Sequence, residues 1–220
     1  KEDLDSIIQT LKQGLAVAAS YGITSLQTDD LAHVPGEDYR LMLQAYRKLH
    51  QNEQLNARIN LQARFGNIDS LRLFLDAGHK TNEGDALLKI GPLKIMGDGS
   101  LGARTAALLS PYSDDANESG ILYYDDASLL ELMQYAHNHG MQIAIHAIGD
   151  KANLQAVDTF LKIQKNSPKD DMRHGIVHCQ IVNDDILKKY QEANIIGYIQ
   201  PIFLDDDIGL VEARLGKTRM

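Results

Sequence analysis

The sequence contains a single cysteine and no long uninterrupted apolar run. One cysteine cannot form an intrachain disulfide, and this is typical of proteins in a reducing compartment. Without a run of about 18 apolar residues, no transmembrane helix is expected. Residues 1–15 are charged and amphipathic, unlike a secretory signal. We therefore predict a cytoplasmic protein that does not insert into membranes.

Basic residues are also scarce. There are 22 Lys and Arg residues against 30 Asp and Glu residues, which gives a net charge of −8. Nucleic acids and anionic membrane surfaces attract clustered positive charge, so we expect neither as a partner. At 220 residues with 44% apolar side chains, the chain can bury a core as one large domain or two small ones.

Short β-like runs alternate with segments of helical periodicity along the chain. Strands are predicted at 23–27, 57–63, 86–99, 141–147, 174–180 and 195–201, and helices at 2–20, 37–52, 67–78, 126–139, 150–165 and 183–193. Pro92 predicts a break or a sheet edge in its strand, Asp150 a helix cap, and residues 103–124 an irregular segment. The alternation implies a parallel sheet, either an open doubly wound sheet or part of a (β/α)8 barrel.

Two of the predicted strands end at a histidine. MQIAIHAIGD (141–150) carries His146, and RHGIVHC (173–179) carries His178. A lone histidine in such an apolar run is more often a core residue, but the repetition favours a shared site. Because the carboxyl ends of parallel strands meet at one rim, these imidazoles could bind a divalent, zinc-type metal. A metal-dependent enzyme is the leading hypothesis.

Three other histidines are predicted to be structural. His174 lies four residues before His178 on the same strand, about 13 Å away at about 3.3 Å per residue, so the two cannot share a metal. We expect His174 to sit lower on the strand or to pair locally. His137 and His139 fall in the last turn of a helix, where imidazoles meet the helix dipole and solvent.

A glycine-rich segment follows the third strand. Residues 97–102 read GDGSLG and match G-x-G-x-x-G, but only a short helix could follow. A sharply turning active-site loop is therefore favoured over a nucleotide-binding oxidoreductase. Asp98 and Arg104 on this loop could bind substrate or pair with each other.

Three further features stay open at this stage. Lys94 lies between Leu93 and Ile95, where a buried cation needs a partner or a modification; the alternative is a solvated lysine on an edge strand. Gln200 could point into the same rim as the two histidines. The acidic run 205–207 predicts a solvated loop rather than a metal cage.

An ordered set of segments resembles the YtcJ-like branch of the amidohydrolase 3 family, within the amidohydrolase superfamily. The segments are YGITSLQTDD (21–30), KIMGDGSLGARTAALLSPYSD (94–114), GILYYDD (120–126), HGMQIAIHAIGDKAN (139–153), RHGIVHCQIV (173–182) and IQP (199–201). The resemblance implies a (β/α)8 metal-dependent hydrolase that cleaves C–N bonds of small amide, N-acyl or N-formyl substrates. One or two zinc-type ions would activate water.

By position, the resemblance implies that His146 and His178 are the metal ligands of the fifth and sixth barrel strands. Lys94 would take the fourth-strand position, where several superfamily members carry a carboxylated lysine. Asp98, Arg104 and Gln200 are the candidate substrate-binding residues. The superfamily also uses a His-x-His pair from its first strand and an aspartate, usually the proton shuttle, from its eighth. Neither occurs at the matching place in this chain, so no catalytic base is assigned.

The expectation is therefore one partial domain over residues 1–220, with strands two to seven of an incomplete (β/α)8 barrel. Such a fragment would be inactive and could be metal-free, and its unpaired sheet edges could form a homodimer. The alternative is a non-catalytic small-molecule-binding module on the same scaffold.

Overall fold

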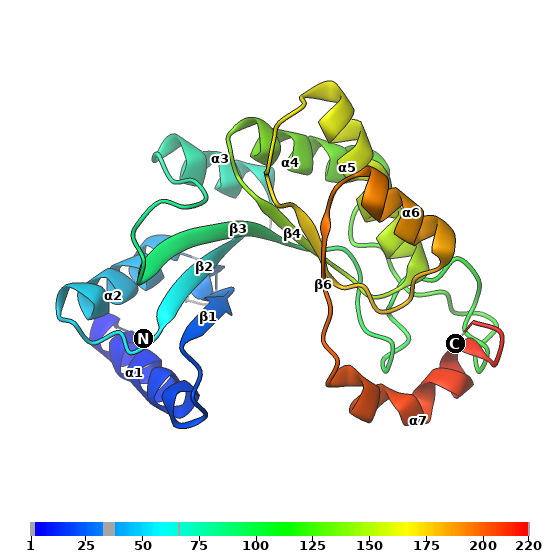
Figure 1. The fold of residues 1–220 in the computed structure, drawn as a ribbon, viewed down its shortest axis with the longest axis horizontal. Coiled ribbons are helices and arrows are strands. Elements are labelled where there is room, and N and C mark those ends of the chain that lie inside the picture. Colours follow the sequence, from blue (N-terminus) through cyan, green and yellow to red (C-terminus); the bar gives the residue numbers. More distant parts are fainter. Residues whose placement is uncertain (1–2, 33–37, 66, 220) are drawn as a thin grey trace. The chain divides into compact units, whose positions relative to one another are not determined.

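Strands and helices alternate through the computed structural model, which describes residues 3–32, 38–65 and 67–219 (Figure 1). The strands are β1 (Ser25–Thr28), β2 (Arg58–Arg64), β3 (Leu88–Met96), β4 (Ile143–Ala147), β5 (Gly175–His178) and β6 (Ile196–Tyr198). The helices are α1 (Leu4–Ser20), the short 3-10 helix η1 (Asp30–Ala32), α2 (Tyr39–Gln51), α3 (Ile68–Asp76), α4 (Asp126–Asn138), α5 (Asp150–Asn166), α6 (Asp184–Glu192) and α7 (Phe203–Leu215). All six predicted strands and six predicted helices are confirmed. Residues 2 and 37, which begin two of the predicted helices, lie outside the described residues.

The six strands are hydrogen-bonded in chain order, from β1 to β6. The pairs β1–β2, β2–β3, β4–β5 and β5–β6 are parallel. In the β4–β5 register, His146 lies opposite Val177 and Ala147 opposite His178. Parallel neighbours joined through helices are the predicted β/α arrangement, and this register brings the ends of two histidine-bearing strands together.

The chain divides into two compact units. Unit 1 comprises residues 1–94 and 139–142, and unit 2 comprises 95–138 and 143–220. In unit 1, α1 and α2 pack together and alternate residues of β2 are buried. In unit 2, every residue of β4 is buried, and α4 and α5 pack against this strand and each other. Burial of β4 on both faces accounts for its apolar residues, among which His146 is the exception.

Pro92 neither ends its strand nor lies at a sheet edge. β3 runs through Pro92, and its place in the strand order is between β2 and β4. The β2–β3 register shifts between Leu61 and Ala63, which pair with Ile90 and Leu93. One extra residue on β3 thus accommodates the proline, which has no N–H to donate to the ladder.

Two local predictions are wrong. The acidic run 205–207 lies within helix α7 rather than in a loop, because carboxylates are favoured in the first turns of a helix. Asp150 is the first residue of α5 and not its cap; its Oδ1 accepts hydrogen bonds from the N–H groups of Leu109 and Lys151 at 2.8 and 2.9 Å. Residues 103–124 are irregular, as predicted. No described helix is long and apolar enough to cross a membrane.

Candidate metal centre

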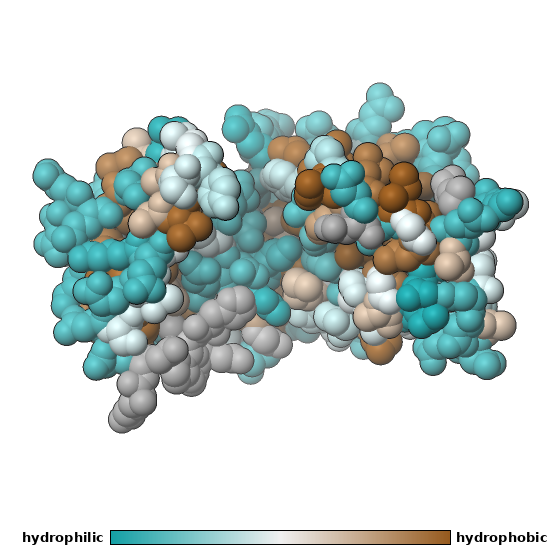
Figure 2. Space-filling model, turned by 90° about the horizontal axis from the view of Figure 1, so that it is seen from below, coloured by the Kyte–Doolittle hydropathy of each residue, from teal (hydrophilic) through white to brown (hydrophobic). Residues whose placement is uncertain are grey.

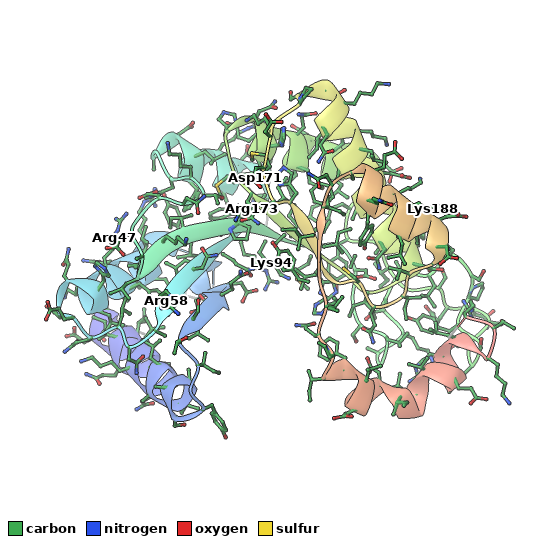
Figure 3. The ribbon with its side chains drawn as sticks, in the orientation of Figure 1. Arg47, Arg58, Lys94, Asp171, Arg173 and Lys188 are labelled. Atoms are coloured by element: carbon green, nitrogen blue, oxygen red, sulfur yellow. The ribbon has the colours of Figure 1, made fainter. Side chains whose placement is uncertain are left out.

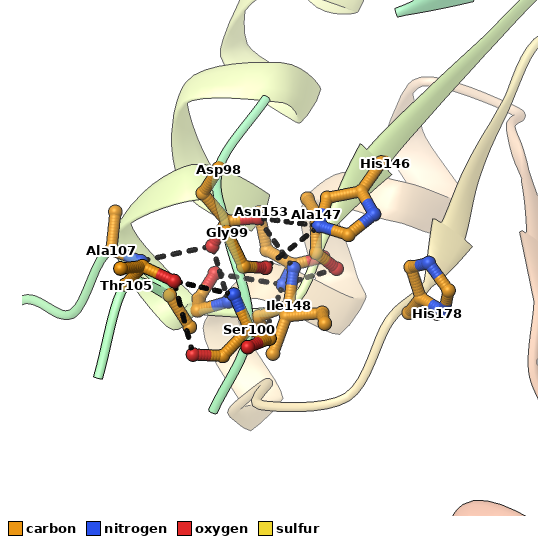
Figure 4. Close-up of polar contacts among 12 residues, drawn as sticks. Asp98, Gly99, Ser100, Thr105, Ala107, His146, Ala147, Ile148, Asn153 and His178 are labelled. Atoms are coloured by element: carbon orange, nitrogen blue, oxygen red, sulfur yellow. Dashed lines mark hydrogen bonds and ion pairs between the residues drawn. The ribbon is translucent and has the colours of Figure 1, made fainter. Parts of the chain in front are cut away.

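His146 and His178 lie against each other at the carboxyl ends of β4 and β5 in unit 2. Their ring centroids are 4.5 Å apart, with the planes at 76°, so the rings meet edge to face (Figure 4). His146 is buried and His178 is partly exposed. The structure thus brings these two predicted residues together, while their role as metal ligands stays a prediction.

The His146 ring is oriented by the glycine-rich loop. Its Nε2 lies 2.9 Å from the carbonyl oxygen of Gly99 and 3.2 Å from Oδ1 of Asp98. Both partners accept hydrogen bonds, so Nε2 carries the proton and Nδ1 holds the lone pair of the neutral ring. Metal-bound histidines commonly donate their second nitrogen to a carbonyl or a carboxylate in this way.

His178 is held in an unusual backbone conformation. Its φ is +81°, and the φ of Cys179 is +50°, so two consecutive non-glycine residues occupy the left-handed region. Each such residue costs about 1–3 kcal/mol and persists only where surrounding contacts impose it. The imidazole stacks on Phe203 with centroids 5.5 Å apart, and Nδ1 donates to Oε1 of Gln200. Gln200 therefore reaches the histidine rim, as predicted.

Asp98 lies inside unit 2 and not on an accessible rim. Its side chain has no exposed surface, and its carboxylate accepts hydrogen bonds from the N–H groups of Ala107, Ile148 and Gly149 at 2.9, 3.0 and 2.8 Å (Figure 4). These bonds join the glycine-rich loop to the end of β4. A substrate could not reach Asp98, because its side chain has no exposed surface. Its hydrogen bonds instead suit a role in holding the loop and His146 in position.

Arg104 pairs with Asp114 rather than with Asp98. Its Nε and Nη2 donate to the two carboxylate oxygens at 3.1 and 2.9 Å. The Arg104 guanidinium, with help from Arg214, holds the pKa of Asp114 below its usual value. This bidentate pair fastens the irregular segment, and a substrate-binding role for Arg104 stays a prediction.

Lys94 belongs to unit 1, on β3 (Figure 3). It is 9% exposed and its strand is not at a sheet edge, so the solvated edge-strand lysine is wrong. Burial lowers the pKa of its amine, and the nearby Asp29 carboxylate opposes that shift. Asp29 is itself paired with Arg64 at 3.3 Å. Lys94 therefore lies in a desolvated position that disfavours the charged amine relative to water.

The donor set around the two imidazoles is partial. Within residues 3–32, 38–65 and 67–219, no group of three or more His, Cys, Asp or Glu side chains is arranged to hold a metal ion. Catalytic zinc sites use three protein ligands and keep one open position. The His146–His178 pair thus fits part of such a site, with one nitrogen of each ring turned to a second protein group.

The sequence pattern missed a buried histidine pair. His137, predicted to meet solvent, has no exposed surface, and its Nδ1 lies 2.8 Å from Nε2 of His174. His174 thus pairs with a residue that is close in space and distant in the sequence, and not with a neighbour along the chain. No motif spans the 37 positions between the two residues, so only the contact itself reveals them.

Similarity to known proteins is extensive. The family model described as the amidohydrolase family matches residues 1–220. A putative amidohydrolase, YtcJ, from Bacillus subtilis (strain 168) is 36% identical over 133 residues, which are 60% of this chain and 25% of that protein. The protein LONG AFTER FAR-RED 3 from Arabidopsis thaliana is 33% identical over 132 residues, 60% of this chain and 23% of that protein.

Two solved structures share the fold. An uncharacterized metal-dependent hydrolase from Pyrococcus horikoshii OT3 superposes with a TM-score of 0.83 at 28% identity, covering 99% of this chain and 41% of that one. An uncharacterized metal-dependent hydrolase from Pyrococcus furiosus has the same TM-score at 27% identity, and the match covers 99% of this chain and 42% of that one. The chain therefore has the fold of an incomplete (β/α)8 barrel and spans less than half of these relatives.

Proposed function

Because the chain belongs to the amidohydrolase family, we propose that it forms part of a zinc-type hydrolase acting on C–N bonds of small amide, N-acyl or N-formyl compounds. The observation that carries this proposal is the edge-to-face contact of His146 and His178 at 4.5 Å. Two imidazoles from neighbouring strand ends supply two of the three protein ligands that a catalytic zinc ion needs. When bound, the metal would supply Lewis-acid activation of water and of the scissile carbonyl.

The two histidines would use different nitrogens. Nδ1 of His146 would face the metal, while Nε2–H stays on the Gly99 carbonyl and near Asp98. Nε2 of His178 would face it, while Nδ1–H stays on Gln200. Asp98 and Gln200 are positioning residues in this scheme because they hold the ligands and not the substrate.

The remaining roles rest on the family resemblance. By the resemblance alone, Lys94, buried on β3, is proposed as a further ligand of the intact enzyme in carboxylated form, and the shuttle aspartate is expected outside this sequence. We accordingly propose that the 220-residue chain alone does not hydrolyse amides. A cytoplasmic location is proposed because Cys179 is a free thiol.

A nucleotide-binding function has less support. The glycine-rich loop is followed by turns at residues 101–104 and not by a helix. A pyrophosphate site of that type needs a helix N-terminus. A non-catalytic binding module on the same scaffold remains the second candidate, since the described residues supply only part of a metal site.

Zinc titration followed by the ring nitrogen resonances of the histidines tests the proposal. We expect Nδ1 of His146 and Nε2 of His178 to shift together at one equivalent of zinc. The exposed His139 is the internal control and should not move. If only His139 responds, zinc binds adventitiously at the surface and the proposed metal centre is wrong.

A further inference from the structure

A cavity of about 730 Å³ opens beside His178 in unit 2. One wall is the apolar stripe of α7, formed by Leu204, Ile208, Val211 and Leu215. The segments that follow β5 and β6 form the opposite wall. Apolar side chains gather on the face of unit 2 seen in Figure 2. The volume lies within the range of about 300–1,000 Å³ that is typical of small-molecule sites.

The cavity has a polar end beside His178, and the rest of its lining is mostly apolar, with three charged side chains, Asp207, Glu212 and Arg219. The polar end consists of His178, Gln180 and Gln200. Phe203, which also lines the cavity, stacks on the His178 ring at 5.5 Å between centroids. The candidate metal ligand and the apolar wall are therefore continuous. A few convergent polar groups at one end of an apolar cavity are typical of a ligand site.

The apolar wall of α7 is accessible. Leu204 is 69% exposed and Ile208 is 74% exposed, one helical turn apart on the same stripe. These two side chains offer exposed apolar surface to a ligand in the cavity.

Charges in the lining set the orientation of a ligand. Asp207 is hydrogen-bonded to Gln180, and Glu212 lies 3.6 Å from Lys217. The Arg219 guanidinium donates to the carbonyl oxygens of Leu215, Ser110 and Pro111. Arg219 is thus engaged by carbonyl oxygens, and Asp207 and Glu212 disfavour an anion along α7, so the carbonyl or carboxylate of a ligand is expected at the His178 end.

We propose that this cavity binds the apolar acyl group of the substrate, with the acyl carbonyl at His178 and the hydrocarbon chain along α7. This inference rests on the proposed hydrolase function and narrows its substrates to amides of apolar carboxylic acids. The acid released by hydrolysis should therefore bind the cavity too.

Calorimetric titration of the 220-residue chain with acetate, hexanoate and decanoate, in the presence of zinc, tests the inference. Affinity should rise about fourfold for each methylene added, because each buries a similar apolar area. Methyl resonances of Ile181 and Val211 should shift with decanoate and not with acetate. Equal affinity for the three acids would overturn the inference.

Ile208→Glu places a charge on the exposed apolar wall without disturbing the core. Decanoate binding should weaken at least tenfold, while acetate binding and zinc content stay unchanged. Leu187→Glu is the matched control, since Leu187 is also exposed but lies on α6 outside the cavity lining. Equal decanoate affinity in the two variants would contradict the cavity assignment.

The outcomes separate this inference from the proposed function. Zinc binding without chain-length-dependent acid binding removes the acyl cavity and leaves the hydrolase proposal standing. Decanoate binding in the cavity without any zinc binding contradicts the hydrolase proposal and overturns the assignment to a substrate acyl group, and leaves an apolar ligand site of the binding-module kind. A dimer that Ile208→Glu converts to a monomer, with no decanoate affinity, would assign the apolar wall to a second copy of the chain and overturn the inference.

Discussion

Nδ1 of His137 and Nε2 of His174 share a hydrogen bond of 2.8 Å inside unit 2. The N–H of Ile143 donates to Nδ1 of His174 at 3.0 Å, so the proton of neutral His174 is on Nε2 and is donated to His137. His137 then donates from Nε2 to the carbonyl oxygen of Ser167 at 2.7 Å. This relay joins the start of β4, the end of α4 and the residue after α5 through two neutral rings.

The relay predicts that the free energy of unfolding decreases as the pH is lowered. Burial lowers the pKa of His174 from 6.5 to about 3, and burial also lowers the pKa of His137. A depressed histidine pKa means that the unfolded chain binds the extra proton first, so the stability is present above about pH 6.5 and is lost as pH falls toward 3. Between pH 7 and pH 5, His174 should remove about 2 kcal/mol from the free energy of unfolding. Urea unfolding at several pH values measures this change in the free energy of unfolding.

His174→Gln is the decisive variant for that prediction. Glutamine can still accept from Ile143 and donate to His137, but it does not titrate. Its unfolding free energy should therefore depend less steeply on pH than that of the original chain. His139→Gln, at an exposed residue just after α4, leaves the relay intact and is the control. Parallel pH profiles for all three proteins would show that the relay does not titrate on unfolding.

Asp98→Asn should destabilise unit 2 strongly. The carboxylate accepts three backbone N–H groups, and an amide would turn its NH₂ toward at least one of them. Leaving a buried donor unsatisfied costs about 1–3 kcal/mol, and more where a charged acceptor is lost. Thermal unfolding measures the loss. Asp171→Asn, which breaks an exposed pair with Arg173, should cost much less because water screens this pair. Similar losses in both variants would refute the positioning role of Asp98.

Gly97→Ala should disturb the end of β4. A Cβ at Gly97 would lie 2.5 Å from the carbonyl oxygen of His146, and this backbone atom has little freedom to move. Overpacking of this kind typically costs about 1–3 kcal/mol. Zinc affinity should fall as well, because the strand that carries His146 must shift. Gly102→Ala is the control, since its Cβ would meet nothing within 4 Å. Unchanged stability and zinc affinity in Gly97→Ala would contradict this account.

The sequence predicts the alternation of strands and helices because apolar periodicity is a local property. It also predicts that His146 and His178 meet, since parallel strands place their carboxyl ends together. Helix α7 was missed because the acidic run 205–207 resembles a loop, although acidic residues near a helix start were an available signal. The buried role of Asp98 could not be predicted, because two of its three donors lie 50 and 51 positions away.

Metal binding by variants of the two strand-end histidines tests the central claim most directly. In the intact enzyme, after equilibration with zinc, dialysis and elemental analysis, the original chain should retain metal, and His146→Ala and His178→Ala should each lose most of it. His139→Ala, in the exposed histidine, should retain as much as the original chain. Undiminished metal in both strand-end variants would show that His146 and His178 do not form the metal centre.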